Sequence, residues 1–143
     1  MAGETARLTP ARLEALLTCQ SFFSEGRSTV SPARLVRTAR AAGFSTVGLA
    51  DWCSVAGAVE LCDEARQQGL SAVIGVTLPV LFPSPPRAST QTQMFPVVLL
   101  ARSREGYTTL CELITAVNLE SPHGLPLDRL RSAGEAFRNT SSA

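Results

Sequence analysis

The sequence predicts an α/β protein built from parallel βα units, and two features support this prediction. A helix-like segment that ends at a glycine and is followed by a short apolar run occurs twice between residues 35 and 76. The two glycines, Gly43 and Gly69, are 26 positions apart (69 minus 43), about the length of one compact βα unit. In such folds functional side chains gather at the carboxyl ends of the strands, so we expect any site to lie there.

The elements up to Gly69 follow from local signals. Thr9 and Pro10 favour a helix start, and Ser31 followed by Pro32 is a second N-cap with proline at the first helical position. We expect a helical extension over residues 1–16, a strand over 17–23, a helix over 32–42, a strand over 46–50 that leads into Asp51, and a helix over 55–68 that buries Val55, Val59, Leu61, Cys62 and Ala65.

Beyond Gly69 the pattern changes. A strand is expected over residues 72–76, and residues 79–94, with four prolines, predict an exposed loop. Its Pro-Ser-Pro-Pro run is either a docking motif or, as we favour, a tolerated insertion. A wholly apolar strand over residues 96–100, covered on both faces, and a helix over 104–119 follow. Residues 125–131 start one more element, and 137–143 form a flexible tail. The chain is therefore a small three-layer sandwich or part of a barrel that is closed elsewhere.

Composition excludes several classes of protein. The 143 residues suit one domain, and a net charge of +1 gives no strong field for nucleic acid or an acidic partner. All 13 basic residues are arginine, which indicates GC-rich coding bias more than an arginine surface. No apolar run is long enough to span a membrane, and the first residues show no signal region. We expect a cytoplasmic protein without a membrane partner.

The four cysteines do not form a metal-binding or redox motif. None is spaced as Cys-x-x-Cys, and His123 is the single histidine. We expect Cys62 and Cys111 to be small buried side chains. Cys19 and Cys53 fall beside strand ends, and the sequence does not decide whether they are buried or functional.

An ordered set of segments resembles one known family. The segments are LTCQSFFSEG at residues 17–26, PARLV at 32–36, GLADW at 48–52, VAGAVE at 55–60, GLSAVIG at 69–75, VLLAR at 98–102 and EGYTTLC at 105–111. Together they resemble the polymerase-and-histidinol-phosphatase (PHP) domain that begins the bacterial DNA polymerase III alpha subunit and its error-prone relative. The resemblance implies a distorted parallel (β/α) barrel, of which residues 17–136 would form the amino-terminal half.

The resemblance also implies a site for two or three divalent metals, and this sequence departs from it. The family has His-x-His on the first strand, Thr-Asp-His after the second and an acidic residue after the third. Those positions hold Thr18 and Gln20, then Ala50, Asp51 and Trp52, and finally Thr77, so that Asp51 alone is kept. The family's later ligands would lie beyond residue 143. One carboxylate cannot hold such a cluster, and we predict no metal, no cofactor and no catalytic residue.

The residues at these positions have other uses. We expect Gln20 to accept a hydrogen bond from Trp52, and Asp51 to cap the next helix or bind a loop amide rather than a cation. Trp52 either fills the space left by the metals, which we favour, or anchors a partner.

Two other groups of residues could suggest function. His123 with Ser121 could suggest nucleophilic catalysis, but an exposed loop histidine is the better interpretation. Arg34, Arg37 and Arg40 could touch DNA, but a solvated helix face fits better.

These observations lead to three functional hypotheses. The first is a catalytically inactive PHP-like domain of a DNA polymerase III alpha-type protein, with a structural or interaction role in DNA replication or repair. Its partners would be the polymerase module or other replisome proteins, and DNA only through the parent complex. The second is a metal-dependent phosphoesterase or 3′–5′ exonuclease of PHP type, completed by another chain. The third is a stand-alone interaction module that dimerises through open sheet edges. Whether the chain is an enzyme stays open, although alone it is not expected to synthesise DNA.

Overall fold

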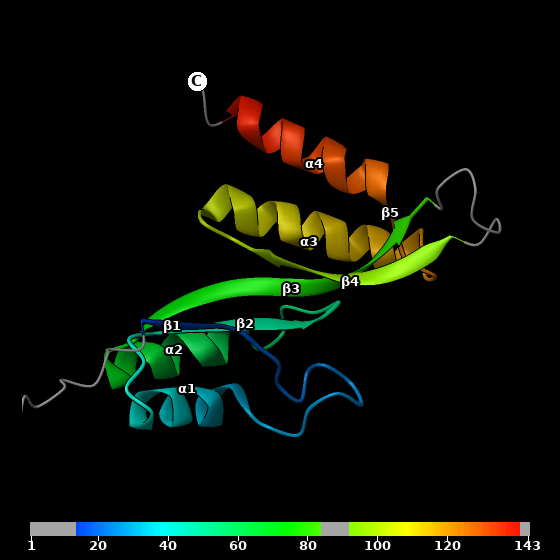
Figure 1. Ribbon diagram of the computed structural model, residues 1–143. Coiled ribbons are helices and arrows are strands. Elements are labelled where there is room, and N and C mark those ends of the chain that lie inside the picture. The colour runs from blue at the N-terminus through cyan, green and yellow to red at the C-terminus, as the bar shows by residue number, and fades with distance from the viewer. Residues whose placement is uncertain (1–13, 84–91, 141–143) are drawn as a thin grey trace, which may run out of the picture.

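The structure is a computed structural model that describes residues 14–83 and 92–140 (Figure 1). Strands and helices alternate along the first part of the chain, and two helices dominate the last part. The elements are β1 (Ala15–Cys19), α1 (Pro32–Ala41), β2 (Thr46–Trp52), α2 (Ala58–Gln68), β3 (Ser71–Phe82), β4 (Gln93–Leu100), α3 (Arg104–Leu119), β5 (Leu125–Pro126) and α4 (Leu127–Thr140).

The first two helices form where their capping signals predict them. The Ser31 hydroxyl accepts a hydrogen bond from the Arg34 N–H at 3.2 Å, and Pro32 opens α1. Gly69 follows α2 with φ of +70°, a left-handed conformation that glycine adopts without steric cost. The repeated pattern of a helix, a glycine and a strand is therefore confirmed.

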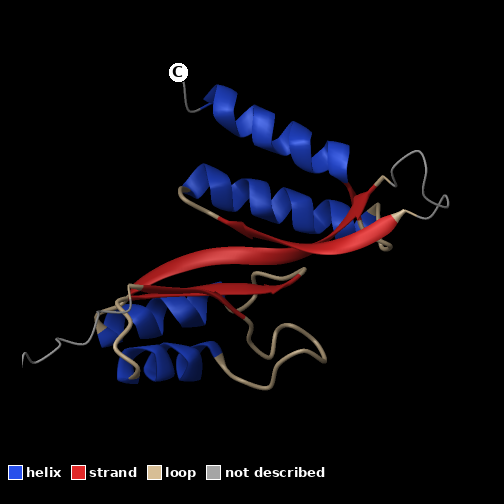
Figure 2. Ribbon diagram, in the orientation of Figure 1, coloured by secondary structure: helices blue, strands red, loops and turns tan. Residues whose placement is uncertain are grey.

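The strands form one mixed sheet in the order β1-β2-β3-β4, with β5 paired to β3 (Figure 2). β1, β2 and β3 are parallel, and their pairing extends to Trp52 opposite Thr77. β3 is 12 residues long, and beyond the end of β2 its last part pairs with β5 at Val80 and Leu81.

The prediction of a loop over residues 79–94 is wrong at both of its ends, where the structure has strands. β3 continues through Pro79 to Phe82, and β4 begins at Gln93 and returns antiparallel to β3. Pro79 lies opposite Pro96, and because neither has an N–H, both are tolerated at a non-hydrogen-bonded pair of the ladder. The rest of the Pro-Ser-Pro-Pro run, from Ser84, lies outside the described residues.

Four smaller expectations need correction. β1 covers Ala15–Cys19. Residues 15 and 16 are therefore strand rather than helix, and residues 20–23, expected as strand, are loop. The rest of the expected helical extension, residues 1–13, lies outside the described part. β4 is not covered on both faces, because most of its residues are exposed. α4 extends through residue 140, into the expected tail. Val59 is 74% exposed rather than buried, because it lies on the solvent side of α2.

Two hydrophobic clusters hold the helices to the sheet. α1 and α2 pack on β2 through a cluster that includes Val36, Leu49 and Leu61. α3 packs on the later part of β3 through a second cluster that includes Leu78 and Leu113. In Figure 1 the two helix pairs lie on opposite sides of the strands.

The sheet is curled, and glycine permits this at the point of closest approach. A Cβ atom on Gly48 would stand 2.5 Å from the backbone oxygen of Leu17 on the neighbouring strand. A Cβ on Gly75 would stand equally close to the backbone oxygen of Leu99. β2 ends at Trp52, opposite Thr77 in the middle of β3. Among the described residues, no helix is both long enough and apolar enough to cross a bilayer.

Candidate functional site

Three residues from the parallel part of the sheet meet at one point: Gln20 just after β1, Ala50 near the end of β2, and Thr77 in the middle of β3. The Gln20 side-chain amide donates to the Ala50 carbonyl and to the Thr77 hydroxyl oxygen, at 3.5 Å each. The Thr77 hydroxyl itself donates to the Ala50 carbonyl at 2.7 Å and is buried. The two longer contacts are weak, because 3.5 Å is beyond the usual range for N–H···O bonds. The three positions therefore form a neutral polar cluster.

Asp51 is fully buried and already has three hydrogen-bond donors. Its carboxylate accepts the Ser21 N–H at 2.6 Å, the Ser21 hydroxyl at 2.7 Å and the Ser24 hydroxyl at 2.6 Å. Hydrogen bonds to an ionised acceptor are short and strong, so these contacts fix the loop after β1 to the end of β2. The interpretation of Asp51 as a partner of a loop amide is confirmed. It does not cap α2, which follows Gly57 without a side-chain cap.

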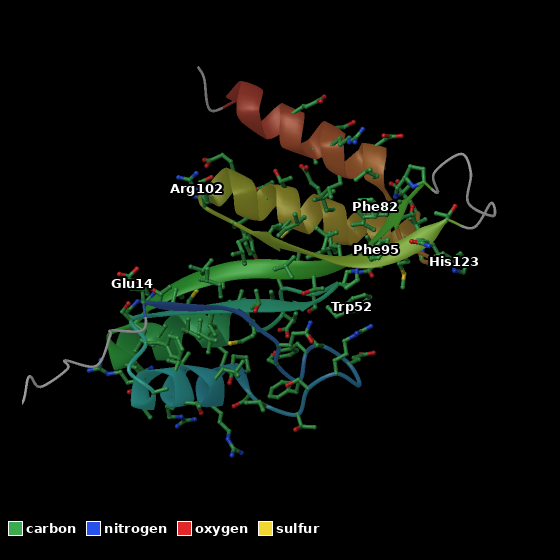
Figure 3. All side chains as sticks on the ribbon, in the orientation of Figure 1. Glu14, Trp52, Phe82, Phe95, Arg102 and His123 are labelled. Atoms are coloured by element: carbon green, nitrogen blue, oxygen red, sulfur yellow. The ribbon has the colours of Figure 1, made fainter. Side chains whose placement is uncertain are left out.

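Trp52 lies beside the loop of residues 20–30 (Figure 3). Side chains alternate along a strand, so Trp52 and Asp51 point to opposite faces of the sheet. The Arg27 guanidinium stacks on the Trp52 ring, 3.7 Å from its centroid, a cation–π contact. The expected hydrogen bond from Trp52 to Gln20 does not form among the described residues, and the Gln20 side chain instead donates to Ala50 and Thr77.

The space beside Trp52 remains open. A cavity of about 590 Å³ is lined by Trp52 together with Phe23, Cys53, Pro79 and Met94, among others. Trp52 is half-buried and forms one wall of this cavity. The ring therefore borders the space without filling it.

The six positions do not fit the metals that the family implies. Thr18 is exposed, Gln20 and Thr77 offer neutral oxygens, and the one carboxylate is directed at the two serines. Over residues 14–83 and 92–140, no three His, Cys, Asp or Glu side chains come together at one point. A divalent cluster needs several anionic or imidazole ligands for each ion, and this donor set does not supply them.

The other candidate residues lie apart from this cluster. His123 is exposed in the turn before β5, as expected, and Figure 3 shows it at the periphery. Arg34, Arg37 and Arg40 are exposed on α1, and Arg37 pairs with Glu64 at 3.7 Å, so the solvated helix face is confirmed.

All four cysteines are free and partly buried. The expectation of buried side chains for Cys62 and Cys111 is thus met only in part. Burial raises the pKa of the Cys19 thiol. Burial also raises the pKa of Cys53, against a smaller lowering by the charge of Arg27. Cys53 has φ of +49°, which is unusual for a residue with a side chain.

Sequence reasoning missed Ser21, Ser24 and Arg27. All three lie in the loop after β1, and their partners Asp51 and Trp52 are about 30 residues away in the chain. A Ser-x-x-Ser pair after one strand and an acid after the next was the available signal. It is weak, because serine is common in loops of every kind.

The arrangement of three parallel strands, crossover helices and a site at the strand ends agrees with the comparison by sequence. Residues 17–139 match the PHP domain family, so the chain belongs to that family.

Among curated proteins, the chain is 39% identical over 99 residues to an error-prone DNA polymerase of Bordetella parapertussis, covering 69% of this chain and 9% of that protein. It is 38% identical over 118 residues to an error-prone DNA polymerase of Anaeromyxobacter sp. (strain K), covering 82% of this chain and 10% of that protein. The chain therefore spans about a tenth of the length of these relatives.

A solved structure shares the fold. It is an amidohydrolase from Chromobacterium violaceum, with a TM-score of 0.50 and 20% sequence identity. The likeness covers 72% of this chain and 33% of that one. A curled sheet of parallel strands with outer helices is thus the part of a PHP-type barrel that this chain represents.

Proposed function

We propose that this chain is a catalytically inactive PHP domain with a structural or interaction role beside a DNA polymerase III alpha-type protein. The observation that supports this proposal best is the state of Asp51. It is the single acidic side chain at the family's early ligand positions, and three donors from Ser21 and Ser24 already occupy its oxygens.

The energetics favour this interpretation over metal binding. Each hydrogen bond to the buried carboxylate contributes about 1.5–3 kcal/mol. A metal ion that took the Asp51 oxygens from these donors would leave the hydroxyl protons of Ser21 and Ser24, which are fully buried, without their acceptor. Coordination by the neutral Gln20 and Thr77 oxygens would compensate for little of the hydrogen-bond free energy lost at Asp51. The network is therefore better suited to holding a loop in place than to exchanging a cation.

The relatives suggest the context. Those named above are error-prone DNA polymerases, in which the matched region is about a tenth of the chain. We infer that the partners are the polymerase module or other replisome proteins, and that DNA is contacted only through the parent complex. This role in replication or repair would be exerted in the cytoplasm.

A hydrolysis assay tests the absence of catalysis. The purified chain is incubated with Mn²⁺ or Zn²⁺ and either bis(p-nitrophenyl) phosphate or a 3′-labelled single-stranded DNA, with Asp51→Asn as the matched variant. We expect both proteins to show the same background rate. Metal-dependent turnover in the original chain that Asp51→Asn abolishes would establish a phosphoesterase or exonuclease instead.

A binding assay tests the interaction role. The chain is mixed with the purified alpha-type polymerase of its own source and run on a sizing column with light scattering. We expect a stable one-to-one complex that survives physiological salt. A chain that stays monomeric beside the polymerase and the other purified replisome proteins would contradict this role.

A further inference from the structure

An open apolar groove lies between α2 and α3, at the end of β3 opposite to the polar cluster. Its volume is about 520 Å³. Small and apolar side chains from α2, β3, α3 and the turn before α3 dominate its lining: Ala58, Cys62, Ala72, Ile74, Ala101 and Tyr107. Burial is the main cause that raises the pKa of both the Tyr107 hydroxyl and the Cys62 thiol.

The groove follows from the topology of the sheet. α2 packs over the start of β3 at Ala72 and Ile74, whereas α3 packs over the later part of β3. β4 returns antiparallel to β3 and ends at Leu100, so within the described residues no crossover helix stands between α2 and α3. In a regular βαβ unit the crossover helix would cover this part of the sheet.

The rim of the groove has unbalanced positive charge. Arg102 and Arg104 line it and are exposed, and neither forms an ion pair within the described residues. Figure 3 shows Arg102 at the turn between β4 and α3. On the opposite rim, Asp63 is already paired with Arg66 at 3.1 Å. Val59 adds an apolar side chain that is 74% exposed.

We propose that this groove binds an amphipathic helix of a partner protein that has acidic residues flanking its apolar face. Small side chains at Ala58, Ala72 and Ala101 would let a helix backbone come close to the edge of the sheet, between α2 and the first turn of α3. Acidic side chains on its flank would pair with Arg102 and Arg104. This is the helix-in-groove mode of recognition, in which apolar anchors supply affinity and charges set orientation and association rate.

The inference goes beyond the proposed function and does not depend on it. The groove lies at the amino end of β3, whereas Gln20, Asp51 and Thr77 lie where β1 and β2 end. A chain that proved to bind Mn²⁺ could still bind the helix, and a chain that bound no helix could still lack metal.

The experiment uses the full chain labelled with ¹⁵N and two synthetic helical peptides. One has leucine and alanine along a single face with glutamate on its flanks, and the other replaces each glutamate with lysine. Chemical-shift changes locate the contact, and fluorescence anisotropy gives the dissociation constant. Arg102→Glu/Arg104→Glu is the test variant, and Arg34→Glu/Arg40→Glu is its control, because it makes the same charge change on the exposed face of α1.

We expect the acidic peptide to shift amide signals of Ala58, Cys62, Ala72 and Ala101. We expect Arg102→Glu/Arg104→Glu to weaken its binding by about tenfold, since attraction becomes repulsion, and the control to change it less than about twofold. Val59→Asp, an exposed change that should not disturb folding, should also weaken binding.

Three outcomes with the peptides would overturn the proposal. They are equal binding of both peptides, shifts that map away from the groove, and no binding of the acidic peptide at about 1 mM. Stronger binding of a single-stranded DNA at Arg102 and Arg104 would also overturn it and would assign the rim to nucleic acid.

Discussion

The part of β3 that pairs with β2 differs between its two ends. Where β2 ends, with Trp52 opposite Thr77, Asp51 and Thr77 are buried polar groups with hydrogen-bond partners. At the amino end, the groove is open and apolar, and Arg102 and Arg104 have no ion-pair partner in the described part of the chain. A saturated polar network stabilises the fold, whereas an open apolar surface with free charges is available for contact. In the proposed account, the polar end therefore stabilises the fold, and the groove at the other end is the surface for contact.

The largest expected effect is at the stabilising end. Asp51→Ala should lower the free energy of unfolding by about 3 kcal/mol or more, because it leaves the buried Ser21 and Ser24 donors without acceptors. Urea denaturation measures the change. Asp63→Ala, which removes an exposed carboxylate near the groove, is the control and should cost less than about 1 kcal/mol. If both variants lost the same free energy of unfolding, the polar network would not stabilise the fold more than the groove does.

The next prediction concerns the close approach of β1 and β2 at Gly48, where the sheet curls. Gly48→Ala should destabilise the chain by about 1–3 kcal/mol, because the Cβ of the new alanine would meet the backbone of Leu17 rather than a flexible side chain. Gly134→Ala in α4 meets no atom within 4 Å and should stabilise the helix by about 0.5–1 kcal/mol. Thermal unfolding of both variants should give shifts of opposite sign. A neutral Gly48→Ala would mean that β1 and β2 lie further apart than described.

Changes at the groove should leave stability almost untouched. Arg102→Glu/Arg104→Glu removes no ion pair from the described residues, so its free energy of unfolding should stay within about 0.5 kcal/mol of the original. The same urea titration measures it. A loss of 2 kcal/mol or more would show that this rim also stabilises the fold.

The smallest effect concerns the thiol beside Trp52. Because burial raises the pKa of Cys53, iodoacetamide should alkylate it slowly at pH 8 and faster as the pH rises above about 9. Arg27→Ala removes the charge that lowers this pKa and should slow the reaction further. The rate at Cys19, whose pKa is raised by burial alone, should not change.

The same shifts predict how stability responds to alkali. A raised pKa in the folded state gives stability that is complete below the unfolded pKa and is lost as the pH rises through the folded value. Cys19 and Cys53 should therefore weaken the fold only in alkaline solution, above about pH 9. Unfolding followed by circular dichroism from pH 7 to 10 would detect this decline.

The parallel part of the fold could be predicted because its signals are local. Ser31 and Pro32 start α1, and glycines follow α1 and α2. The antiparallel return could not be predicted, since Pro79 and Pro96 indicate a loop unless one knows that they lie opposite each other.

In the candidate site, too, some residues could be predicted from the sequence and others could not. The resemblance singled out Gln20, Asp51 and Thr77, which lie where β1 and β2 end, and the Asp51 bond to a loop amide followed from its type. Ser21 and Ser24 could not be predicted as its partners, because the contact depends on how the loop after β1 folds across the end of β2. The groove was also beyond prediction, since it exists only because β4 turns back.

The central claim is that the strand ends no longer form a metal site, and a Mn²⁺ titration followed by electron paramagnetic resonance tests it directly. The original chain should leave the free-ion signal unchanged at physiological salt. A variant that restores the family's ligand types, Thr18→His/Gln20→His/Trp52→His/Thr77→Glu, should reduce that signal if the scaffold is kept. Stoichiometric Mn²⁺ binding by the original chain, lost in Asp51→Asn, would contradict the account.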